Sequence, residues 1–146
     1  MKTKKGFTLI ELMVVVAVIG LLSLLGLRLY TGQQEKAKNA VVKANAGTMQ
    51  TIIQGNMVDN DYAQDTSGER ITAALSDITN AGGCRNPYTG GFGNNNVVKA
   101  TGDSLADGDD IDFGKVAIAS PGKNEFNFQG LDQNGELFGD ALQAIK

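Results

Sequence analysis

A run of apolar residues near the amino terminus constrains this chain more than any other feature. Residues 7–27 contain a single charged residue, Glu11, and are otherwise dominated by Leu, Val and Ile. As a helix, these twenty-one residues would extend roughly 31 Å, which is close to the hydrocarbon thickness of a bilayer. The run therefore predicts a helix that is long enough to cross a membrane.

Charge is distributed unevenly on the two sides of this run. Lys2, Lys4 and Lys5 precede it, whereas the chain from Thr31 onward carries nine basic and fifteen acidic residues, a net charge of −6. Lysines before a membrane segment favour a cytoplasmic amino terminus. The sequence therefore predicts an acidic body beyond the membrane, and it shows no general basic surface of the kind that binds nucleic acid.

Three interpretations of the run compete. A cleaved secretory signal peptide needs a small-residue cleavage site, and the following RLYTGQQEKAK offers no convincing one. A plain membrane anchor leaves Glu11 unexplained, because an acid in the middle of a membrane helix costs about 2.5–3.5 kcal/mol. No side chain on the same helix face is expected to pair with it. A third interpretation must explain this acid and the abrupt change from charged to apolar sequence at Gly6-Phe7.

At these residues the chain resembles the type IV pilins and the related pseudopilins of type II secretion. Their pattern is a short basic leader ending in Gly, followed by Phe, Thr, Leu, an aliphatic residue, Glu and Leu. Here the leader ends at Gly6 and is followed by Phe7-Thr8-Leu9-Ile10-Glu11-Leu12. The resemblance covers about the first 27 residues. It implies cleavage after Gly6 by a membrane prepilin peptidase, N-methylation of Phe7, and assembly into a helical filament in which Glu11 is the assembly residue.

The resemblance also implies an organisation in three parts. Residues 1–6 would be the leader, residues 7–30 the membrane-spanning and filament-core helix, and residues 31–146 a globular body that includes the second half of the helix. Many pilins have a proline in the second half of the apolar stretch, where this chain has Arg28. The segment from Gly26 to Gly32 is the candidate for bending, because each glycine weakens a helix by about 1 kcal/mol relative to alanine.

Two helices are predicted after the apolar run. The first helix should continue to about Val58, with one apolar stripe and a polar face opposite it. The stripe comprises Val42, Ala46, Met49, Ile53 and Met57, and the polar face comprises Lys38, Asn39, Lys43, Asn45 and Gln50. A capping box, Thr66-x-x-Glu69, predicts the start of a second helix that ends at residues 81–83.

Alternating apolar residues predict strands in the remainder of the chain. Candidate strands cover residues 97–100, 113–120, 125–131 and 136–138, and Asn134-Gly135 is a strong hairpin signal. The predicted fold class is α+β: a long N-terminal helix packed on a small, three- or four-stranded antiparallel sheet, similar to a type IV pilin. Cys84 cannot form an internal disulfide and is expected to be a small buried residue.

No catalytic constellation is present. The chain contains no histidine, which excludes Ser-His-Asp and Cys-His catalysis. Five aspartates between residues 103 and 112 form an acidic, Gly-containing loop. Asp107, Asp109, Asp110 and Asp112 are the candidate ligands for Ca²⁺, a metal for which the resemblance to major pseudopilins also gives some support. A solvated acidic loop is the competing interpretation.

These features favour a structural filament subunit, the major pilin of a type IV pilus, which is not an enzyme. Such a subunit would partner with copies of itself, the membrane, the prepilin peptidase and the assembly platform. It would begin as a single-pass protein of the cytoplasmic (inner) membrane and end in an extracellular filament. The alternative is a major pseudopilin of a type II secretion system. The absence of a second cysteine argues against the common Gram-negative pilin body, whose C-terminal loop is usually closed by two cysteines, and it fits pseudopilins and Gram-positive-type pilins. A membrane-anchored enzyme would need a site that the sequence does not contain.

Overall fold

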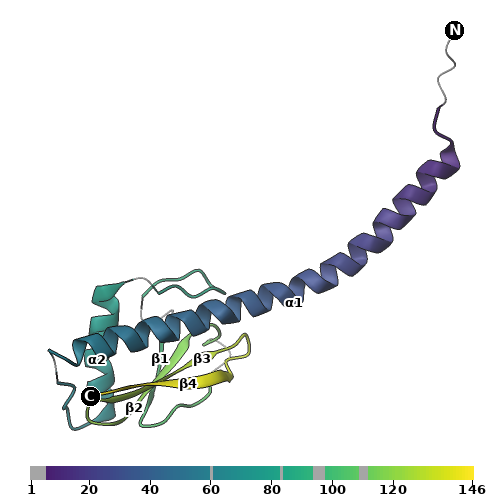
Figure 1. Ribbon diagram of the computed structural model, residues 1–146. Helices are drawn as coiled ribbons and strands as arrows, with labels where there is room; N and C mark the ends of the chain where they lie inside the picture. Colours follow the sequence, from purple (N-terminus) through teal and green to yellow (C-terminus); the bar gives the residue numbers. More distant parts are fainter. Residues whose placement is uncertain (1–5, 60, 83, 94–97, 109–111) are drawn as a thin grey trace. The chain divides into compact units, whose positions relative to one another are not determined.

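The computed structural model describes residues 6–59, 61–82, 84–93, 98–108 and 112–146. The chain divides into two compact units, Met1–Lys36 and Ala37–Lys146, and each is described by itself. The elements in chain order are α1 (Leu9–Asn56), α2 (Ser67–Ala81), β1 (Val98–Gly102), β2 (Val116–Gly122), β3 (Glu125–Leu131) and β4 (Leu137–Ile145) (Figure 1). This arrangement confirms the predicted α+β fold class, with a long N-terminal helix and a small sheet.

The second half of α1 packs in the second unit through the predicted apolar stripe. All five stripe residues are at most 2 % exposed, and they belong to one hydrophobic cluster with residues of α2 and the sheet. Figure 1 shows this part of α1 lying along the sheet. Since full burial of one such side chain contributes about 1.5–3 kcal/mol, the stripe anchors the helix to the sheet.

The opposite, polar face of α1 differs from the prediction at Asn45. Asn45 is buried, and its Nδ2 donates a hydrogen bond to the main-chain oxygen of Arg85 at 2.9 Å. The helical pattern predicts Asn45 on the water-facing side, but a buried amide is stable where it finds a partner. The segment that supplies this partner, residues 84–93, therefore covers one flank of α1.

The second helix begins and ends at the predicted signals. Thr66 is the N-cap of α2, and its Oγ1 accepts a hydrogen bond from the Glu69 N–H at 3.3 Å. At the other end, Gly82 has φ = 67°, which favours glycine, and its N–H donates to the oxygens of Ile78 and Thr79. Both ends of α2 thus satisfy main-chain groups that the helix itself leaves unpaired.

The sheet is mixed, with strand order β1-β2-β3-β4. The pairs β2–β3 and β3–β4 are antiparallel, as expected, but β1 pairs in parallel with β2. A parallel pair needs a connection of about a dozen residues or more, and residues 103–115 provide it. The sequence prediction of a wholly antiparallel sheet therefore fails at this one pair.

The strand β4 is longer than the predicted segment 136–138 and contains a bulge. Phe128 pairs with Leu142 and Gly130 pairs with Phe138, so Gln129 faces the three residues 139–141 of β4. Gly139 has φ = 72°, and its oxygen accepts a hydrogen bond from the Gln129 side chain. The hairpin before β4 turns at the predicted Asn134-Gly135, where the Asp132 side chain accepts hydrogen bonds from the N–H groups of Asn134 and Glu136.

Aromatic side chains fill the centre of the second unit. Phe126 and Phe128 are fully buried on β3, and Tyr62 contacts Phe126 edge-on with ring centroids 5.1 Å apart. The Tyr62 hydroxyl donates to Asp77 on α2, and burial together with this hydrogen bond raises the pKa of Tyr62. Cys84 is buried, as predicted, and burial raises the pKa of its thiol, which lowers its reactivity.

The segment between α1 and α2 is fastened to the end of the sheet. Asn124, with φ = 56°, accepts a hydrogen bond from the Tyr62 N–H at 2.6 Å and donates to the Tyr62 oxygen at 3.1 Å. The Lys146 N–H donates to the Asn124 oxygen, and its ammonium group pairs with Asp61. The hydrogen bond from the Lys146 ammonium group to Asp61, together with the positive charge of that group, lowers the pKa of the Asp61 carboxyl.

We expect Gly130→Ala to destabilise the second unit by about 1–3 kcal/mol, because the new methyl group overpacks the core. An added Cβ would lie 2.7 Å from Cε1 of Phe138 and 3.0 Å from Cγ1 of Val42. Thermal unfolding of the full chain in detergent, followed by circular dichroism, measures the effect. Gly47→Ala is the control, because no atom lies within 4 Å of its added Cβ and alanine favours a helix. Equal melting temperatures of the two variants would contradict the packing described above.

Candidate processing and assembly segment

The predicted cleavage site lies directly before α1. Gly6 and Phe7 are exposed and precede the first helical residue, and an added Cβ on Gly6 would meet no atom within 4 Å. The Phe7 side chain is 89 % exposed. The peptide bond between them is therefore outside the hydrogen-bonded helix and open to approach.

The first turn of α1 contains a capping box formed by Thr8 and Glu11. The Glu11 carboxylate accepts hydrogen bonds from the Thr8 N–H at 2.8 Å and from the Thr8 hydroxyl at 2.7 Å. In return, Thr8 Oγ1 accepts a bond from the Glu11 N–H at 3.3 Å. Such reciprocal bonds satisfy two main-chain donors that a helix leaves unpaired at its start. A negative charge is also favourable there because of the helix dipole.

This arrangement corrects the expectation that no side chain on the same helix face pairs with Glu11, because the Thr8 hydroxyl donates to its carboxylate. The main-chain N–H of Thr8 at the helix start is a second, uncharged partner. The signal was present in the sequence, since Thr8-x-x-Glu11 before an apolar run is the same pattern that predicted the start of α2 at Thr66.

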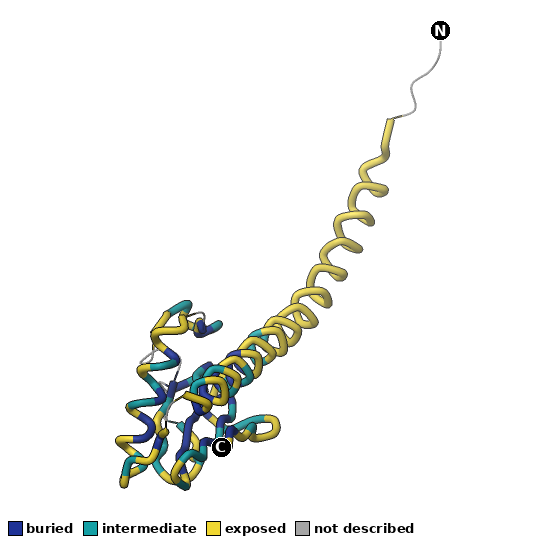
Figure 2. The backbone as a smooth tube through the Cα atoms, turned by 60° about the vertical axis from the view of Figure 1, so that its left-hand side comes forward, coloured by how far each residue is buried: buried dark blue, intermediate teal, exposed yellow. Residues whose placement is uncertain are grey.

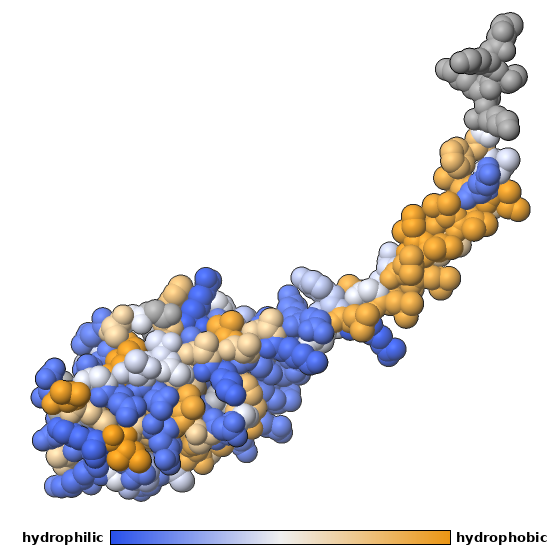
Figure 3. All heavy atoms as spheres, viewed as in Figure 1, coloured by the Kyte–Doolittle hydropathy of each residue, from blue (hydrophilic) through white to orange (hydrophobic). Residues whose placement is uncertain are grey.

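The apolar part of α1 that follows is exposed on every side within its own unit (Figure 2). In Figure 3 it forms a nearly continuous apolar surface, interrupted by polar colour close to its beginning. The α1 helix is long and apolar enough to cross a membrane. The exposed side chains with relative exposures of 48–76 % are Leu9, Ile10, Leu12, Met13, Val14, Val15, Val16, Val18, Ile19, Leu21, Leu22, Leu24, Leu25, Leu27 and Leu29.

Polar groups within this apolar part are satisfied locally. The Ser23 hydroxyl donates to the Ile19 oxygen at 2.8 Å, and the Thr31 hydroxyl donates to the Arg28 oxygen at 3.1 Å. Glu11 lies in an open hollow of about 360 Å³ together with Phe7, Ile10, Val14 and Val15. The Glu11 side chain is exposed and lies beside these apolar side chains, which makes it a distinctive feature of this surface.

The helix is continuous through the predicted bending segment. α1 has no break at Gly26 or Gly32, and no atom lies within 4 Å of a Cβ added at either position. Bending of this segment in a filament stays a prediction.

The acidic loop is only partly described. Asp107 accepts a hydrogen bond from the Leu137 N–H at 2.8 Å, whereas Asp112 is buried between Lys99 and Lys115, at 2.6 and 2.8 Å. Asp109 and Asp110 lie outside the described residues. The part of the chain that is described holds no group of three or more His, Cys, Asp or Glu side chains that could hold a metal ion. Calcium binding stays a prediction, and a calcium ion at Asp112 would compete with two lysines.

Comparison with known proteins agrees with the features of this segment. Residues 1–27 match the prokaryotic N-terminal methylation motif. The chain is 30 % identical over 122 residues to the type IV major fimbrial protein FimA of Dichelobacter nodosus, an alignment that covers 80 % of this chain and 76 % of the relative. Fimbrial protein EcpB of Eikenella corrodens is 43 % identical over 54 residues, covering 37 % of this chain and 34 % of EcpB. No solved structure matches significantly. The chain belongs to the type IV pilin family, whose members are structural proteins rather than enzymes.

We expect Thr8→Val to weaken the start of α1, because valine keeps the shape of threonine but lacks the hydroxyl. Loss of an N-cap costs about 1 kcal/mol, which corresponds to roughly fivefold faster exchange of the Glu11 amide hydrogen. Hydrogen exchange of the full chain in detergent micelles, read by NMR, measures this change. Thr8→Ser keeps the hydroxyl and should exchange within twofold of the original chain. Equal protection in the two variants would contradict the capping box.

Proposed function

We propose that this chain is the major pilin of a type IV pilus, a subunit that polymerises through its apolar N-terminal helix into a surface filament. The observation that carries the proposal is a helix exposing apolar side chains on all sides, with one carboxylate in its first turn. In water such a surface is unstable, so it needs either lipid or other apolar helices around it. The membrane surrounds the helix with lipid first, and a filament of bundled copies then surrounds it with other apolar helices.

The proposed sequence of events begins in the cytoplasmic membrane. The apolar part of α1 spans the bilayer, and a prepilin peptidase cuts between Gly6 and Phe7, which is the exposed bond before the helix. N-methylation of Phe7 follows, and an assembly platform then moves the subunit into the extracellular filament. The filament serves adhesion, twitching motility or DNA uptake.

Glu11 is proposed to set the position of each subunit along the filament. Cleavage creates an α-amino group on Phe7, with a reference pKa near 8, which carries a positive charge at neutral pH. A carboxylate without a partner among packed apolar helices is costly, and the Phe7 amine of the same or a neighbouring subunit offsets this cost. An apolar seam alone can slide, whereas a charged pair fixes one register.

The alternative is a major pseudopilin, whose short filament drives protein secretion. The two share the N-terminal motif, and the single cysteine of this chain fits a pseudopilin as well. The name of the FimA relatives, type IV major fimbrial protein, favours the pilin.

Shearing of cells that produce this chain tests the proposal. We expect abundant long filaments whose subunit begins at N-methylated Phe7 by mass spectrometry. Short or absent filaments, with the processed subunit retained in the membrane, would favour the pseudopilin. A mature subunit that begins at Met1, or after Leu27, would contradict the proposed processing.

We expect Glu11→Gln to abolish filaments while leaving the start of α1 intact. Glutamine also serves in a capping box, so this variant keeps the hydrogen bonds to Thr8 but removes the charge. Membrane insertion should be unchanged, because removal of a charge eases insertion. The amount of sheared filament relative to the subunit in the membrane measures the effect, with Glu35→Gln on the same helix as the control. Normal filaments from Glu11→Gln would show that the charge has no role in assembly.

A further inference from the structure

Apart from Lys43, the basic residues of the second unit fall into two groups by the kind of side chain that they contact. Arg70, Lys99, Lys115, Lys123 and Lys146 each have a nitrogen within 4.0 Å of a carboxylate oxygen. Lys38 and Arg85 instead lie over aromatic rings. The Lys38 Nζ is 4.9 Å from the centroid of the Tyr88 ring, and the Arg85 guanidinium carbon is 5.0 Å from that of Phe92.

These four residues form what we call the aromatic–cation patch: Lys38, Arg85, Tyr88 and Phe92. Phe92 is 64 % exposed and Arg85 is exposed, although the two residues contact each other and form an isolated β-bridge. An arginine and an exposed aromatic ring are side chains that protein interfaces favour. A cation over a ring also keeps its positive charge available to an approaching carboxylate.

The patch is held rigidly against α1. Asn45 donates to the Arg85 oxygen at 2.9 Å, and the Tyr88 hydroxyl donates to Asn39 Oδ1 at 2.6 Å. Within the loop, Asn86 is 1 % exposed and its Oδ1 accepts bonds from the N–H groups of Tyr88 and Thr89. A surface that is already ordered loses little conformational entropy when a partner binds.

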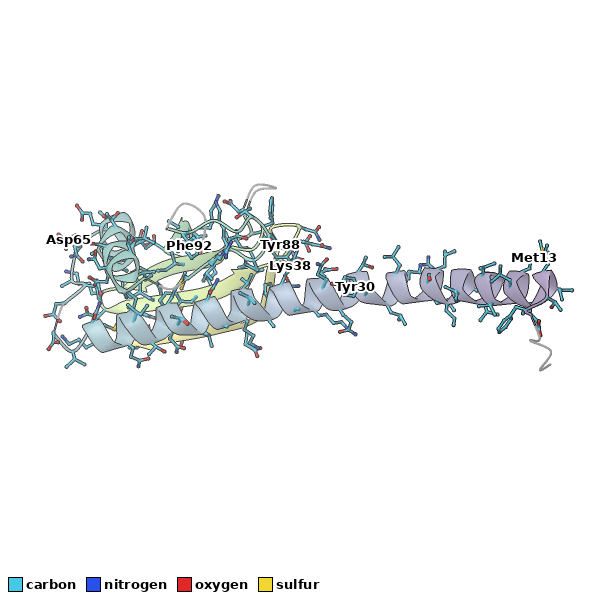
Figure 4. The ribbon with its side chains drawn as sticks, turned by 90° about the horizontal axis from the view of Figure 1, so that it is seen from above. Met13, Tyr30, Lys38, Asp65, Tyr88 and Phe92 are labelled. Atoms are coloured by element: carbon cyan, nitrogen blue, oxygen red, sulfur yellow. The ribbon has the colours of Figure 1, made fainter. Side chains whose placement is uncertain are left out.

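An acidic segment lies at the other end of the same unit. Residues 59–69 contain Asp59, Asp61, Asp65 and Glu69 and no basic residue, and Asp59, Asp65 and Glu69 are exposed. Figure 4 shows Asp65 at the opposite end of this unit from Lys38 and Tyr88. Along α1, residues 38 and 56 are about 27 Å apart. Lys123 and Lys146 pair with Asp65 and Asp61, so these two lysines offset part of the negative charge.

We propose that the aromatic–cation patch of one copy binds the acidic segment of a second copy of this chain. The inference rests on the proposed function, because it concerns contacts within the filament. The second copy is favoured by charge, since the chain carries net negative charge and presents its acidic segment at the end of this unit opposite Lys38 and Tyr88. A contact between two different surfaces of identical subunits does not close on itself, so it repeats along an open filament.

Charge reversal on both surfaces tests the contact. The first variant is Lys38→Glu with Arg85→Glu, the second is Asp59→Lys with Asp65→Lys, and the third combines all four substitutions. Each variant is produced in place of the original chain in the organism that makes it. The amount of sheared filament is measured relative to the amount of subunit in the membrane. We expect at least a tenfold loss of filament in the first and second variants, and recovery to at least half of the original amount in the third.

Two control variants each carry a single charge reversal of the corresponding sign elsewhere in the second unit. The controls are Lys43→Glu and Asp140→Lys. Lys43 lies on α1 outside the patch, Asp140 lies on β4, and both side chains are exposed. Each should leave filament within twofold of the original. Limited proteolysis of the membrane-inserted full chain shows whether a variant folds, and recovery in the combined variant requires folding in any case.

The outcomes separate this contact from the proposed function. Filament from the original chain, together with normal filament from the first variant, overturns the contact and leaves the pilin proposal standing. Loss in all three variants, with the chains folded, also overturns it, because reversed charges should attract as the original ones do. Absence of filament from the original chain contradicts the proposed function instead.

Discussion

The packing of one stripe of α1 on the sheet is the contact on which the folded body depends. Phe126 and Phe128 of β3 are fully buried, and they belong to the same hydrophobic cluster as the α1 residues Met49 and Ile53 and the buried face of α2. Because the helix lies in this place, Asn45 can hold the segment at residue 85, and Tyr62 can join α2 to the core. Local hydrogen bonds then refine an arrangement that apolar burial has already determined.

Most elements of the fold could be predicted because their signals are local. The period of the α1 stripe, the cap at Thr66 and the turn at Asn134-Gly135 depend on residues a few positions apart. The parallel pairing of β1 with β2 could not be predicted, because it depends on the path of a long connection. The length of β4 was missed for another reason: Gly139 and Asp140 look like the end of a strand, although they form a bulge within it.

The N-terminal segment illustrates how strongly a contiguous motif constrains a prediction. Gly6, Phe7 and Glu11 stand at the expected spacing, and the family comparisons agree with the class of protein that they indicate. The hydrogen bonds of Glu11 to Thr8 give this acid a role in starting the helix, besides the one proposed in the filament. The surroundings of Asp112 in the acidic loop could not be predicted from the loop's own residues. The two lysines that pair with Asp112 come from β1 and from the residue before β2.

The bulge in β4 has a consequence for subunits that are crowded together. β4 is an edge strand, and the edge of a sheet can pair with the edge of another copy and start an amyloid-like aggregate. Bodies along a filament are held close to one another at a very high local concentration, where this danger is greatest. At the bulge, Gly139 turns the main chain out of the regular ladder, and the exposed Asp140 places a negative charge there. If the β4 edges of two neighbouring bodies met, their hydrogen-bonding patterns would be interrupted and their charges would repel. The β4 edge therefore resists pairing of the two sheets even where the bodies are crowded together.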